Sequence, residues 1–232
     1  MAPTNPDPAI LSGISLFRGL PARELERLAP LLHERSFPSD TNVITAEEKA
    51  DSVYVILEGT AKVYMTHTDG QEVILAILGP GEIVGEMSAA DSHGRSASVL
   101  TLEDSTLLWM ERHTFLTSME QMPTVARNLV GILSRRLRLA DTHARSLAVL
   151  DVHGRVAAQL LAFAREYGEP LPDGGTLIPL RLTQTDLAAL VGASRVRVNQ
   201  VLGYYRKRGS ISLNKDHRII VLEEESLARR AR

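Results

Sequence analysis

An acid, a guanidinium and hydroxyl groups occur close together in one segment, GPGEIVGEMSAADSHGRSASV, which spans residues 79–99. Arg95 has a planar fork that suits a phosphate, and Ser96 adds a hydroxyl and a backbone amide. Gly85 lets the backbone come close to a ligand, and Glu86 can accept a hydrogen bond from a sugar hydroxyl. A small molecule that carries both a phosphate and a ribose would therefore engage both ends of the segment. The alternative is a structural salt bridge between Arg95 and Glu86.

A second set of polar side chains lies on a helix that is predicted to begin after Ser194. In the first turns of a helix in the major groove, arginine can bond in a bidentate manner to guanine, and asparagine or glutamine to adenine. The residues of these types are Arg195, Arg197, Asn199 and Gln200. Ser194 with the N-terminal amides, and the later Arg206, Lys207 and Arg208, suit phosphate groups. Residues 194–210 contain no acid to neutralise these charges, which favours DNA binding over a solvated helix face.

Positive charge is concentrated at the C-terminal end of the chain. The formal net charge is −2, yet residues 181–232 carry eleven Lys and Arg against five Asp and Glu. The rest of the chain is correspondingly acidic. A basic module joined to an acidic body indicates a nucleic-acid partner, although basic residues also cluster by chance near a chain end.

The region between residues 36 and 109 has the period-two alternation and the β-forming residues that are typical of strands. Segments such as SVYVILEG, EVILAILG and STLLWM are separated by turn signals. These signals are Glu58-Gly59, Asp69-Gly70, Gly79-Pro80-Gly81 and His93-Gly94. Several short strands at nearly even spacing predict a sandwich or barrel of the jelly-roll kind.

A long helix is predicted from about Pro123 to Ala148. Apolar residues recur in it at alternating steps of three and four, which is the a/d pattern of a coiled coil. The positions are Ala126, Val130, Leu133, Leu137, Ala140, Ala144 and Leu147. The stripe is narrow and is flanked by the basic segment SRRLR, so pairing of two subunits is favoured over packing of the helix on its own domain.

Two further helices and a hairpin are predicted after residue 181. Before them, an amphipathic helix is expected to start after Gly154. Thr183 begins an N-terminal capping pattern for a helix that ends at Gly192, and Ser194 caps the next helix, which continues to about Lys207. A short glycine-containing turn between two helices is typical of the helix-turn-helix. The alternating ISLNKDHRIIVL predicts a hairpin that would form a wing beside it.

The composition excludes several kinds of site. The chain has 232 residues and no cysteine, which excludes disulfides, thiolate zinc sites and iron–sulfur clusters. No window approaches about 18 uncharged apolar residues and no secretory signal is evident, so we expect a cytoplasmic protein without a membrane span. An enzyme that used the jelly-roll would need clustered histidines and a carboxylate as metal ligands. His67 and His93 stand alone in turn-like segments, so we expect neither catalysis nor a metal.

The order of these motifs resembles the cyclic AMP receptor protein (CRP/FNR) family of bacterial transcription regulators. GEIVGEMSAADSHGRSASV resembles the phosphate-binding cassette of that family, LDVHGRVA its hinge after the dimer helix, and ALVGASRVRVNQVL its recognition unit. The resemblance covers nearly the whole chain. It implies an α+β fold in three parts. These are an N-terminal β jelly-roll that binds a cyclic nucleotide (residues 1–122), a long dimerisation helix (123–150) and a C-terminal winged helix-turn-helix domain (151–232).

The resemblance also implies roles for particular residues. Glu86 takes the ribose-contacting place, and Arg95 with Ser96 takes the cyclic-phosphate place. The implied ligand site comprises Gly85, Glu86, Met87, Ser88, Arg95, Ser96, Asp141 and Thr142. In the family's cyclic AMP binders, hydroxyl residues of the long helix contact the adenine, whereas Ala140 and Asp141 stand at those places here. Asp141 can accept from the adenine amino group, and Thr142 follows it.

The recognition helix departs from the family pattern, which is Arg-Glu and then Arg four residues beyond the Glu. This chain has Arg195-Val196 and Gln200, so only Arg195 carries over and a different operator is expected. We predict a homodimeric, sequence-specific DNA-binding regulator that is controlled by a cyclic nucleotide, with cyclic AMP preferred. RNA polymerase is the further partner that the resemblance implies. The alternative is the same fold acting without a ligand or with a different small effector.

Overall fold

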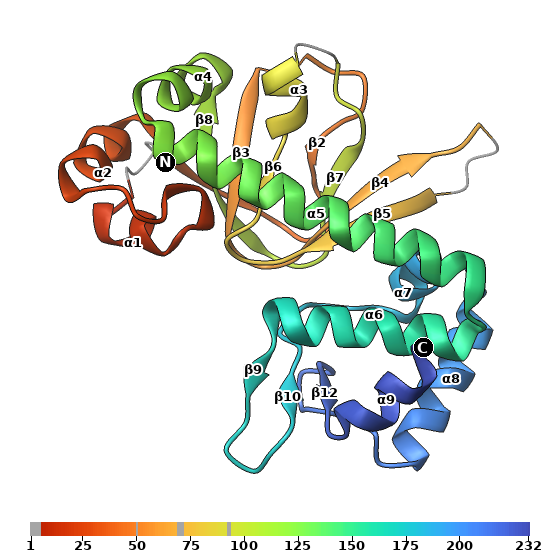
Figure 1. Ribbon diagram of the computed structural model, residues 1–232. Coiled ribbons are helices and arrows are strands. Elements are labelled where there is room, and N and C mark those ends of the chain that lie inside the picture. Colours follow the sequence, from red (N-terminus) through yellow and green to blue (C-terminus); the bar gives the residue numbers. More distant parts are fainter. Residues whose placement is uncertain (1–5, 50, 69–71, 92–93) are drawn as a thin grey trace. The chain divides into compact units, whose positions relative to one another are not determined.

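The computed structural model describes residues 6–49, 51–68, 72–91 and 94–232. The chain divides into two compact units. The first comprises Met1–Gln71 and Leu75–Arg135, and the second comprises Glu72–Ile74 and Arg136–Arg232. The predicted α+β architecture is confirmed: a β domain, a long helix and a C-terminal helix-turn-helix domain follow one another along the chain (Figure 1).

Two four-stranded sheets form the β domain (Figure 1). One sheet has the strand order β1-β8-β3-β6 and the other β2-β7-β4-β5. The strands are β1 His33–Phe37, β2 Asn42–Ile44, β3 Ser52–Glu58, β4 Ala61–Thr66, β5 Glu72–Leu78, β6 Ile83–Val84, β7 Ser98–Thr101 and β8 Ser105–Glu111. Strand β8 pairs antiparallel with both β1 and β3, so strands from the two ends of the domain lie side by side. This arrangement confirms the jelly-roll prediction.

Glycine turns connect several of these strands. Gly59 (φ +95°) lies between β3 and β4, and Gly81 (φ +85°) lies before β6, both in the left-handed region that favours glycine. The turns predicted at Glu58-Gly59 and Gly79-Pro80-Gly81 are therefore confirmed. The turns predicted at Asp69-Gly70 and His93-Gly94 involve residues that lie outside the described ranges.

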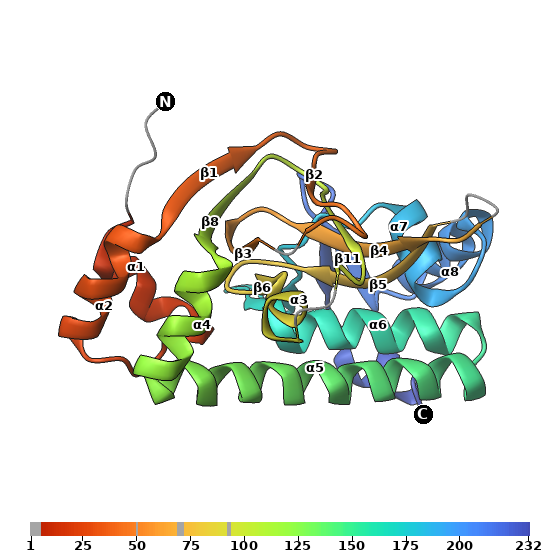
Figure 2. The ribbon, with the colours of Figure 1, turned by 90° about the horizontal axis from the view of Figure 1, so that it is seen from above.

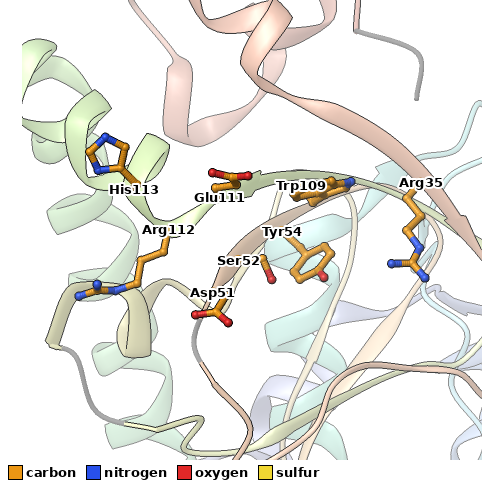
Figure 3. Close-up of a pocket in the computed structure, with 8 residues that line it drawn as sticks. All are labelled: Arg35, Asp51, Ser52, Tyr54, Trp109, Glu111, Arg112 and His113. Atoms are coloured by element: carbon orange, nitrogen blue, oxygen red, sulfur yellow. The ribbon is translucent and has the colours of Figure 1, made fainter. Parts of the chain in front are cut away.

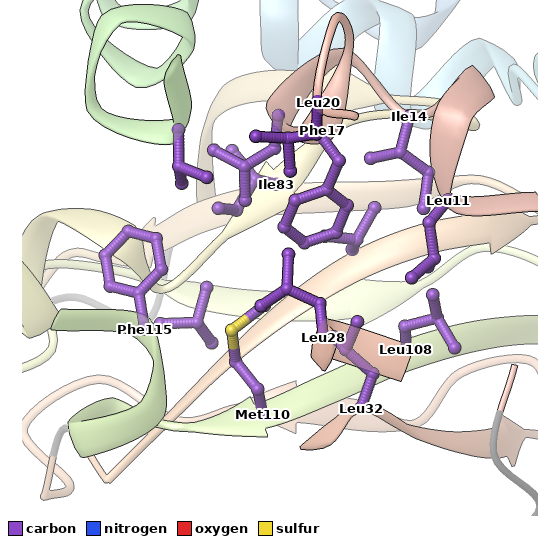
Figure 4. Packing of buried hydrophobic residues seen from close by; sticks show 14 of the residues in the cluster. Leu11, Ile14, Phe17, Leu20, Leu28, Leu32, Ile83, Leu108, Met110 and Phe115 are labelled. Atoms are coloured by element: carbon purple, nitrogen blue, oxygen red, sulfur yellow. The ribbon is translucent and has the colours of Figure 1, made fainter. Parts of the chain in front are cut away.

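Alternation along the strands sends side chains into two separate cores. Val53 and Val55 of β3 point to the outer face of their sheet and belong to the same buried cluster as Leu108 and Met110 of β8. Figure 4 shows Leu108 and Met110 in this cluster. This face is covered by α1 Pro8–Gly13, α2 Ala22–Leu28, α4 Arg112–Gln121 and the start of α5, all of which contribute buried residues to the same cluster. Figure 2 shows α1, α2 and α4 grouped at one end of the β domain.

The second core lies between the two sheets. Phe37, Ile56 and Leu107 come from one sheet, and Ile44 and Val99 come from the other. Because successive residues of a strand face opposite sides, Ser52, Tyr54 and Ile56 share the inner face of β3. This inner face reaches the segment that was singled out for its chemistry.

The long helix α5 runs from Pro123 to Val149, close to its predicted limits. Val125, Leu129 and Ile132 are buried against the β domain. A different stripe is exposed: Val130 is 63% and Leu137 is 64% accessible. These exposed positions belong to the predicted a/d seam, whereas Leu133 of that seam packs partly against the core.

The second unit has the element order α6 Val152–Tyr167, β9 Glu169–Pro170, β10 Thr176–Leu177, α7 Gln184–Val191, α8 Arg195–Lys207, β11 Ile211–Leu213, β12 Ile219–Val221 and α9 Glu224–Arg230. The hairpin β11–β12 belongs to a sheet with the order β11-β12-β10-β9, which confirms the predicted wing. The expected start of α6 after Gly154 was wrong. The helix begins at Val152 because the Asp151 side chain caps it by accepting from the Gly154 amide at 2.8 Å.

Capping residues and one glycine define the ends of the two helices of the helix-turn-helix, as predicted. The Thr183 side chain accepts from the Asp186 amide at the start of α7. Gly192 ends that helix with left-handed backbone (φ +61°), and the Ser194 hydroxyl caps α8 by accepting from the Arg197 amide. None of the helices in the part of the chain that the structure describes is both long and apolar enough to cross a membrane.

Candidate functional site

The segment with candidate ligand-binding chemistry connects β6 to β7 through the short helix α3 Glu86–Asp91. Gly85 precedes this helix with φ +83°. A Cβ atom placed on Gly85 would lie 2.6 Å from Nη1 of Arg95 and 3.1 Å from the carbonyl oxygen of Ser52. Glycine is therefore required there both by its backbone conformation and by the close approach of the Arg95 guanidinium.

Arg95 is folded into the β domain and is only 6% exposed. Its Nη1 donates to the Gly85 carbonyl at 3.1 Å, and its Nη2 donates to the Ser52 carbonyl at 2.7 Å. The structure thus brings Arg95 and Gly85 together, as the sequence predicted for the phosphate site. The hydrogen bonds of this guanidinium go to these two carbonyls and to the Ser52 hydroxyl at 3.4 Å, so the alternative of a salt bridge from Arg95 to Glu86 is not supported.

Burial affects the electrostatics of this guanidinium. Desolvation lowers the pKa of Arg95 from its usual value, and nearby Tyr54 and the carboxylates of Asp51, Glu48 and Glu86 act in the opposite direction. Carbonyl dipoles satisfy the donors but supply less negative charge than an anion would. A phosphate placed against Arg95 would therefore be favoured electrostatically.

The other predicted cassette residues differ in exposure. Glu86 is 3% and Ser88 is 4% exposed, so both are buried at the start of α3. Met87, which lies between them, is 55% exposed, and Ser96 is also exposed. The buried pair therefore faces the interior with Arg95, whereas Met87 and Ser96 lie at the surface.

Asp141 and Thr142 lie on the exposed face of α5 in the second unit. The Thr142 hydroxyl donates to the Arg138 carbonyl one turn earlier, at 2.9 Å, so its proton is used within the helix. Its oxygen can still accept a hydrogen bond, and the Asp141 carboxylate can accept from an amino group. Ala140 beside them is exposed and has no polar group to offer.

A cavity of about 530 Å³ adjoins Ser52, whose carbonyl receives Arg95. It is lined by Arg35, Asp51, Ser52, Tyr54, Trp109, Glu111, Arg112 and His113 (Figure 3). None of the described residues of the predicted cassette lines it. The sequence analysis did not identify this cavity, because its lining comes from β1, β3, β8 and α4, which are distant in the chain.

An ion pair that the sequence analysis also missed joins the cassette strand to the long helix. Nη2 of Arg135 on α5 lies 2.6 Å from Oε1 of Glu82, which precedes β6. The Glu82 side chain is 6% exposed and that of Arg135 is 29% exposed. A largely desolvated, charge-assisted contact of this length holds α5 near the start of the cassette.

The second candidate site is the exposed face of α8. Val198 and Val201 are fully buried, which turns the opposite face of the helix to solvent. The predicted DNA-binding side chains that are exposed there are Ser194, Arg195, Arg197, Asn199, Gln200, Arg206 and Lys207. Hydrogen bonds hold the side-chain amides of Gln200 and Asn199 in place. Arg197 donates to Gln200 at 3.3 Å, and Gln184 donates to Asn199 at 3.1 Å. These residues therefore all lie at the solvent-exposed surface of α8 and its N-cap.

Val196 is an apolar residue on the same face that was not assigned a role from the sequence. It is 68% exposed between two arginines. An exposed valine on a helix that reads base edges can contact the methyl group of thymine. The sequence did contain a signal for this role, because the family pattern has Glu at the position that Val196 occupies here.

The Cyclic nucleotide-binding domain family model matches residues 34–122, and the Crp-like helix-turn-helix domain model matches residues 154–230. The CRP-like cAMP-activated global transcriptional regulator of Mycobacterium tuberculosis is 34% identical over 224 residues, which cover 96% of this chain and 99% of that protein. This chain belongs to the CRP/FNR family. It is a DNA-binding transcription regulator with a cyclic-nucleotide-binding domain.

Solved structures of the CRP/FNR family share this fold. The Thermus thermophilus catabolite activator protein is 34% identical, with a TM-score of 0.52 and coverage of 94% of this chain and 98% of that one. The c-di-GMP responsive regulator CLP of Xanthomonas campestris is 27% identical, with a TM-score of 0.68 and coverage of 87% and 99%. The Mycobacterium tuberculosis relative is named for activation by cAMP and the Xanthomonas campestris relative for its response to c-di-GMP, so membership of the CRP/FNR family does not identify the effector.

An enzymatic use of the jelly-roll would require grouped metal ligands. Among the residues that the structure describes in this CRP/FNR-family chain, no three His, Asp or Glu side chains are grouped so as to hold a metal ion. His93, one of the two histidines considered for such a role, lies outside the described residues.

Proposed function

We propose that this protein is a homodimer that binds cyclic AMP in the cassette and then binds an operator with high affinity. The observation that carries the proposal is the buried Arg95 beside Gly85, at the place where the family cassette receives the cyclic phosphate. Glu86, buried at the start of α3, would accept from the ribose hydroxyl. Ser88 and Met87 would complete the cassette, and the Ser96 hydroxyl would donate a hydrogen bond to the phosphate.

Base recognition would come from the long helix. Asp141 can accept from the adenine amino group, and Thr142 offers an acceptor oxygen beside it. Cyclic AMP carries such an amino group on its adenine ring, so it can supply the donor that this contact requires. The ligand would then touch both the cassette and α5, and Glu82 with Arg135 would hold these elements together at one end.

Pairing of α5 with its copy is supported by the exposure of the predicted seam. Val130 and Leu137 are each more than half exposed, and Leu147 is 43% exposed. Large apolar residues in such a row are stabilised when a second helix covers them. The remaining seam positions are Ala126, Leu133, Ala140 and Ala144.

Two copies of α8 related by a two-fold axis would read half-sites about 34 Å apart. Arg195, Arg197, Asn199 and Gln200 would contact bases, while Ser194, Arg206 and Lys207 would contact phosphates. Ligand binding would shift the hinge at residues 150–154 toward the arrangement that binds DNA, because only a ligand that prefers one state can shift the equilibrium. RNA polymerase is the expected further partner.

The test is a cyclic AMP titration of the ligand-free protein, with fluorescence anisotropy of a labelled operator as the readout. The operator is first selected from random DNA with the protein and nucleotide. We expect cyclic AMP to tighten DNA binding by about 5- to 150-fold, which is the usual range of coupling between two sites. Arg95→Ala serves as the matched control and should require a more than about tenfold higher cyclic AMP concentration for the same response. A coupling near zero in the wild-type protein would overturn the proposal.

A second candidate is the same regulator with a different effector or none. It is favoured by Ala140 and Asp141, which stand where the family's cyclic AMP binders carry hydroxyls, and by the c-di-GMP responsiveness named for the Xanthomonas campestris relative. Cyclic di-GMP in place of cyclic AMP in the same titration distinguishes the two. Tight operator binding that neither nucleotide changes would support the ligand-independent version.

A further inference from the structure

Two arginines from different elements converge on one phenolic oxygen at the end of the recognition helix. Nη1 of Arg208 donates to Oη of Tyr204 at 2.8 Å, and Nη2 of Arg230 donates to the same oxygen at 3.4 Å. Arg208 follows α8, and its guanidinium carbon also lies 5.4 Å from the centre of the Tyr204 ring. Arg230 is the last residue of α9. The fold therefore brings the basic end of α9 to the C-terminal end of α8.

The site concentrates positive charge. Neither Arg208 nor Arg230 forms an ion pair with a carboxylate among the described residues. Asp151 stabilises Arg230 at longer range, but its side chain is used to cap α6. Hydrogen bonds from Arg230 and Arg208 lower the pKa of Tyr204, which means that negative charge is favoured at this oxygen. Three further exposed cations lie in the last turns of α8 and α9, namely Arg206, Lys207 and Arg229.

Neighbouring side chains hold this cluster in place. The His153 ring packs edge-on against Tyr204, with 5.0 Å between the ring centres. Tyr205 is buried, and its hydroxyl donates to the His153 carbonyl at 2.9 Å. Burial raises the pKa of Tyr205 to about 12, so this hydroxyl remains a donor. The recognition helix is thereby fixed to the start of α6 beside the arginines.

The distance from the reading residues places the cluster at the edge of a major groove. A helix rises about 1.5 Å per residue, so Tyr204 lies about 6 Å beyond Gln200 along the axis of α8. The reading residues 195–200 span about 7.5 Å of the same axis, and the groove is only about 12 Å wide. If α8 crosses the groove with its first turns on the bases, its C-terminal end would lie near the sugar–phosphate strand.

We propose that Arg208 and Arg230, both bonded to the Tyr204 hydroxyl, form a phosphodiester site that binds the DNA backbone at the border of the half-site read by α8. The site adds α9, outside the helix-turn-helix and its wing, to the DNA-binding surface. The inference rests on DNA binding through the exposed face of α8. The two guanidiniums that now donate to the Tyr204 oxygen would donate to phosphate oxygens. Bidentate hydrogen bonds from arginine to phosphate are strong.

The first test is the salt dependence of operator binding by the full-length protein. Removing one phosphate contact should reduce the slope of log K against log salt by about 0.9 for each subunit bound. We expect this change for Arg230→Ala, and for Arg230→Gln, which keeps most of the side chain. Arg165→Ala is the matched control, since Arg165 is exposed in the same unit and pairs with Glu224 instead. It should leave the slope unchanged.

The second test replaces single phosphates of the operator flank by neutral methylphosphonates. The wild-type protein should lose affinity at one flanking phosphate in particular, and Arg230→Gln should be insensitive at that position. Tyr204→Phe should weaken the response to the same phosphate while sequence preference stays as in the wild type, because the hydroxyl only positions the arginines.

Two results would overturn the phosphodiester site. One is an unchanged salt slope and methylphosphonate profile in folded Arg230→Gln. The other is a changed base preference in that variant, which would assign Arg230 to positioning α8. In both cases specific operator binding by the wild-type protein would persist, so the function proposed above would stand. Absence of specific binding by the wild-type protein would instead count against that function.

Discussion

The contact between Gly85 and Arg95 leads to a quantitative prediction about stability. Gly85 and Gly81 have nearly the same positive φ, +83° and +85°. A Cβ on Gly81 would meet nothing within 4 Å, whereas a Cβ on Gly85 would lie 2.6 Å from Nη1 of Arg95. Gly81→Ala is therefore a matched control that carries the backbone strain of Gly85→Ala without its steric conflict.

The expected magnitudes follow from these two contributions. An alanine in the left-handed region costs about 1–2 kcal/mol, and Gly81→Ala should destabilise the ligand-free protein by that amount. Gly85→Ala should cost the same and, in addition, the hydrogen bond from Arg95 to the Gly85 carbonyl. A hydrogen bond to a charged group contributes about 1.5–3 kcal/mol, so the total for Gly85→Ala is about 2.5–5 kcal/mol.

Urea unfolding followed by tryptophan fluorescence measures these values. Trp109 on β8 is the single tryptophan of the chain, so its fluorescence reports on the unit that contains both glycines. In an Arg95→Ala background the cost of Gly85→Ala should fall toward that of Gly81→Ala. Equal losses for the two glycine variants in the wild-type background would refute the reasoning, because they would show that the Arg95 contact has no energetic weight.

Three further outcomes are expected. Arg95→Ala should weaken cyclic AMP binding by at least about 1.5 kcal/mol, or more than about tenfold, in calorimetry; an unchanged affinity would remove Arg95 from the phosphate site. Val196→Ala should abolish the preference for thymine over uracil at one operator position, a difference of about 0.8 kcal/mol or about fourfold for one methyl group; a uracil scan that gives the same profile for both proteins would contradict this. Burial lowers the pKa of His143 below its usual 6.5. As the pH falls, the unfolded chain therefore binds this proton before the folded protein does, and the second unit should lose stability as the pH falls through and below 6.5. His143→Gln should remove that part of the pH dependence in thermal unfolding between about pH 7.5 and about pH 5.5, and an identical pH profile in the variant would exclude His143 as its source.

Local features of the fold were predictable because their causes lie within a few residues. The caps at Thr183 and Ser194 and the left-handed Gly192 each depend on neighbours three or four positions away. The start of α6 was misplaced because the capping residue, Asp151, precedes a glycine that is normally expected to end or interrupt a helix. That Gly154 is needed for packing instead, since a Cβ there would lie 2.6 Å from the Arg230 carbonyl.

The sequence by itself determined the jelly-roll, the long helix, the helix-turn-helix and the residue types of both candidate sites, because periodicity, capping and charge act locally. Only the tertiary structure decided which partners those residues have. Arg95 bonds to Ser52 across 43 positions, Arg135 to Glu82 across 53, and Arg230 to Tyr204 across 26. Such contacts arise when strands and helices that are remote in the chain pack side by side, and no pattern along the sequence encodes which side chains then meet.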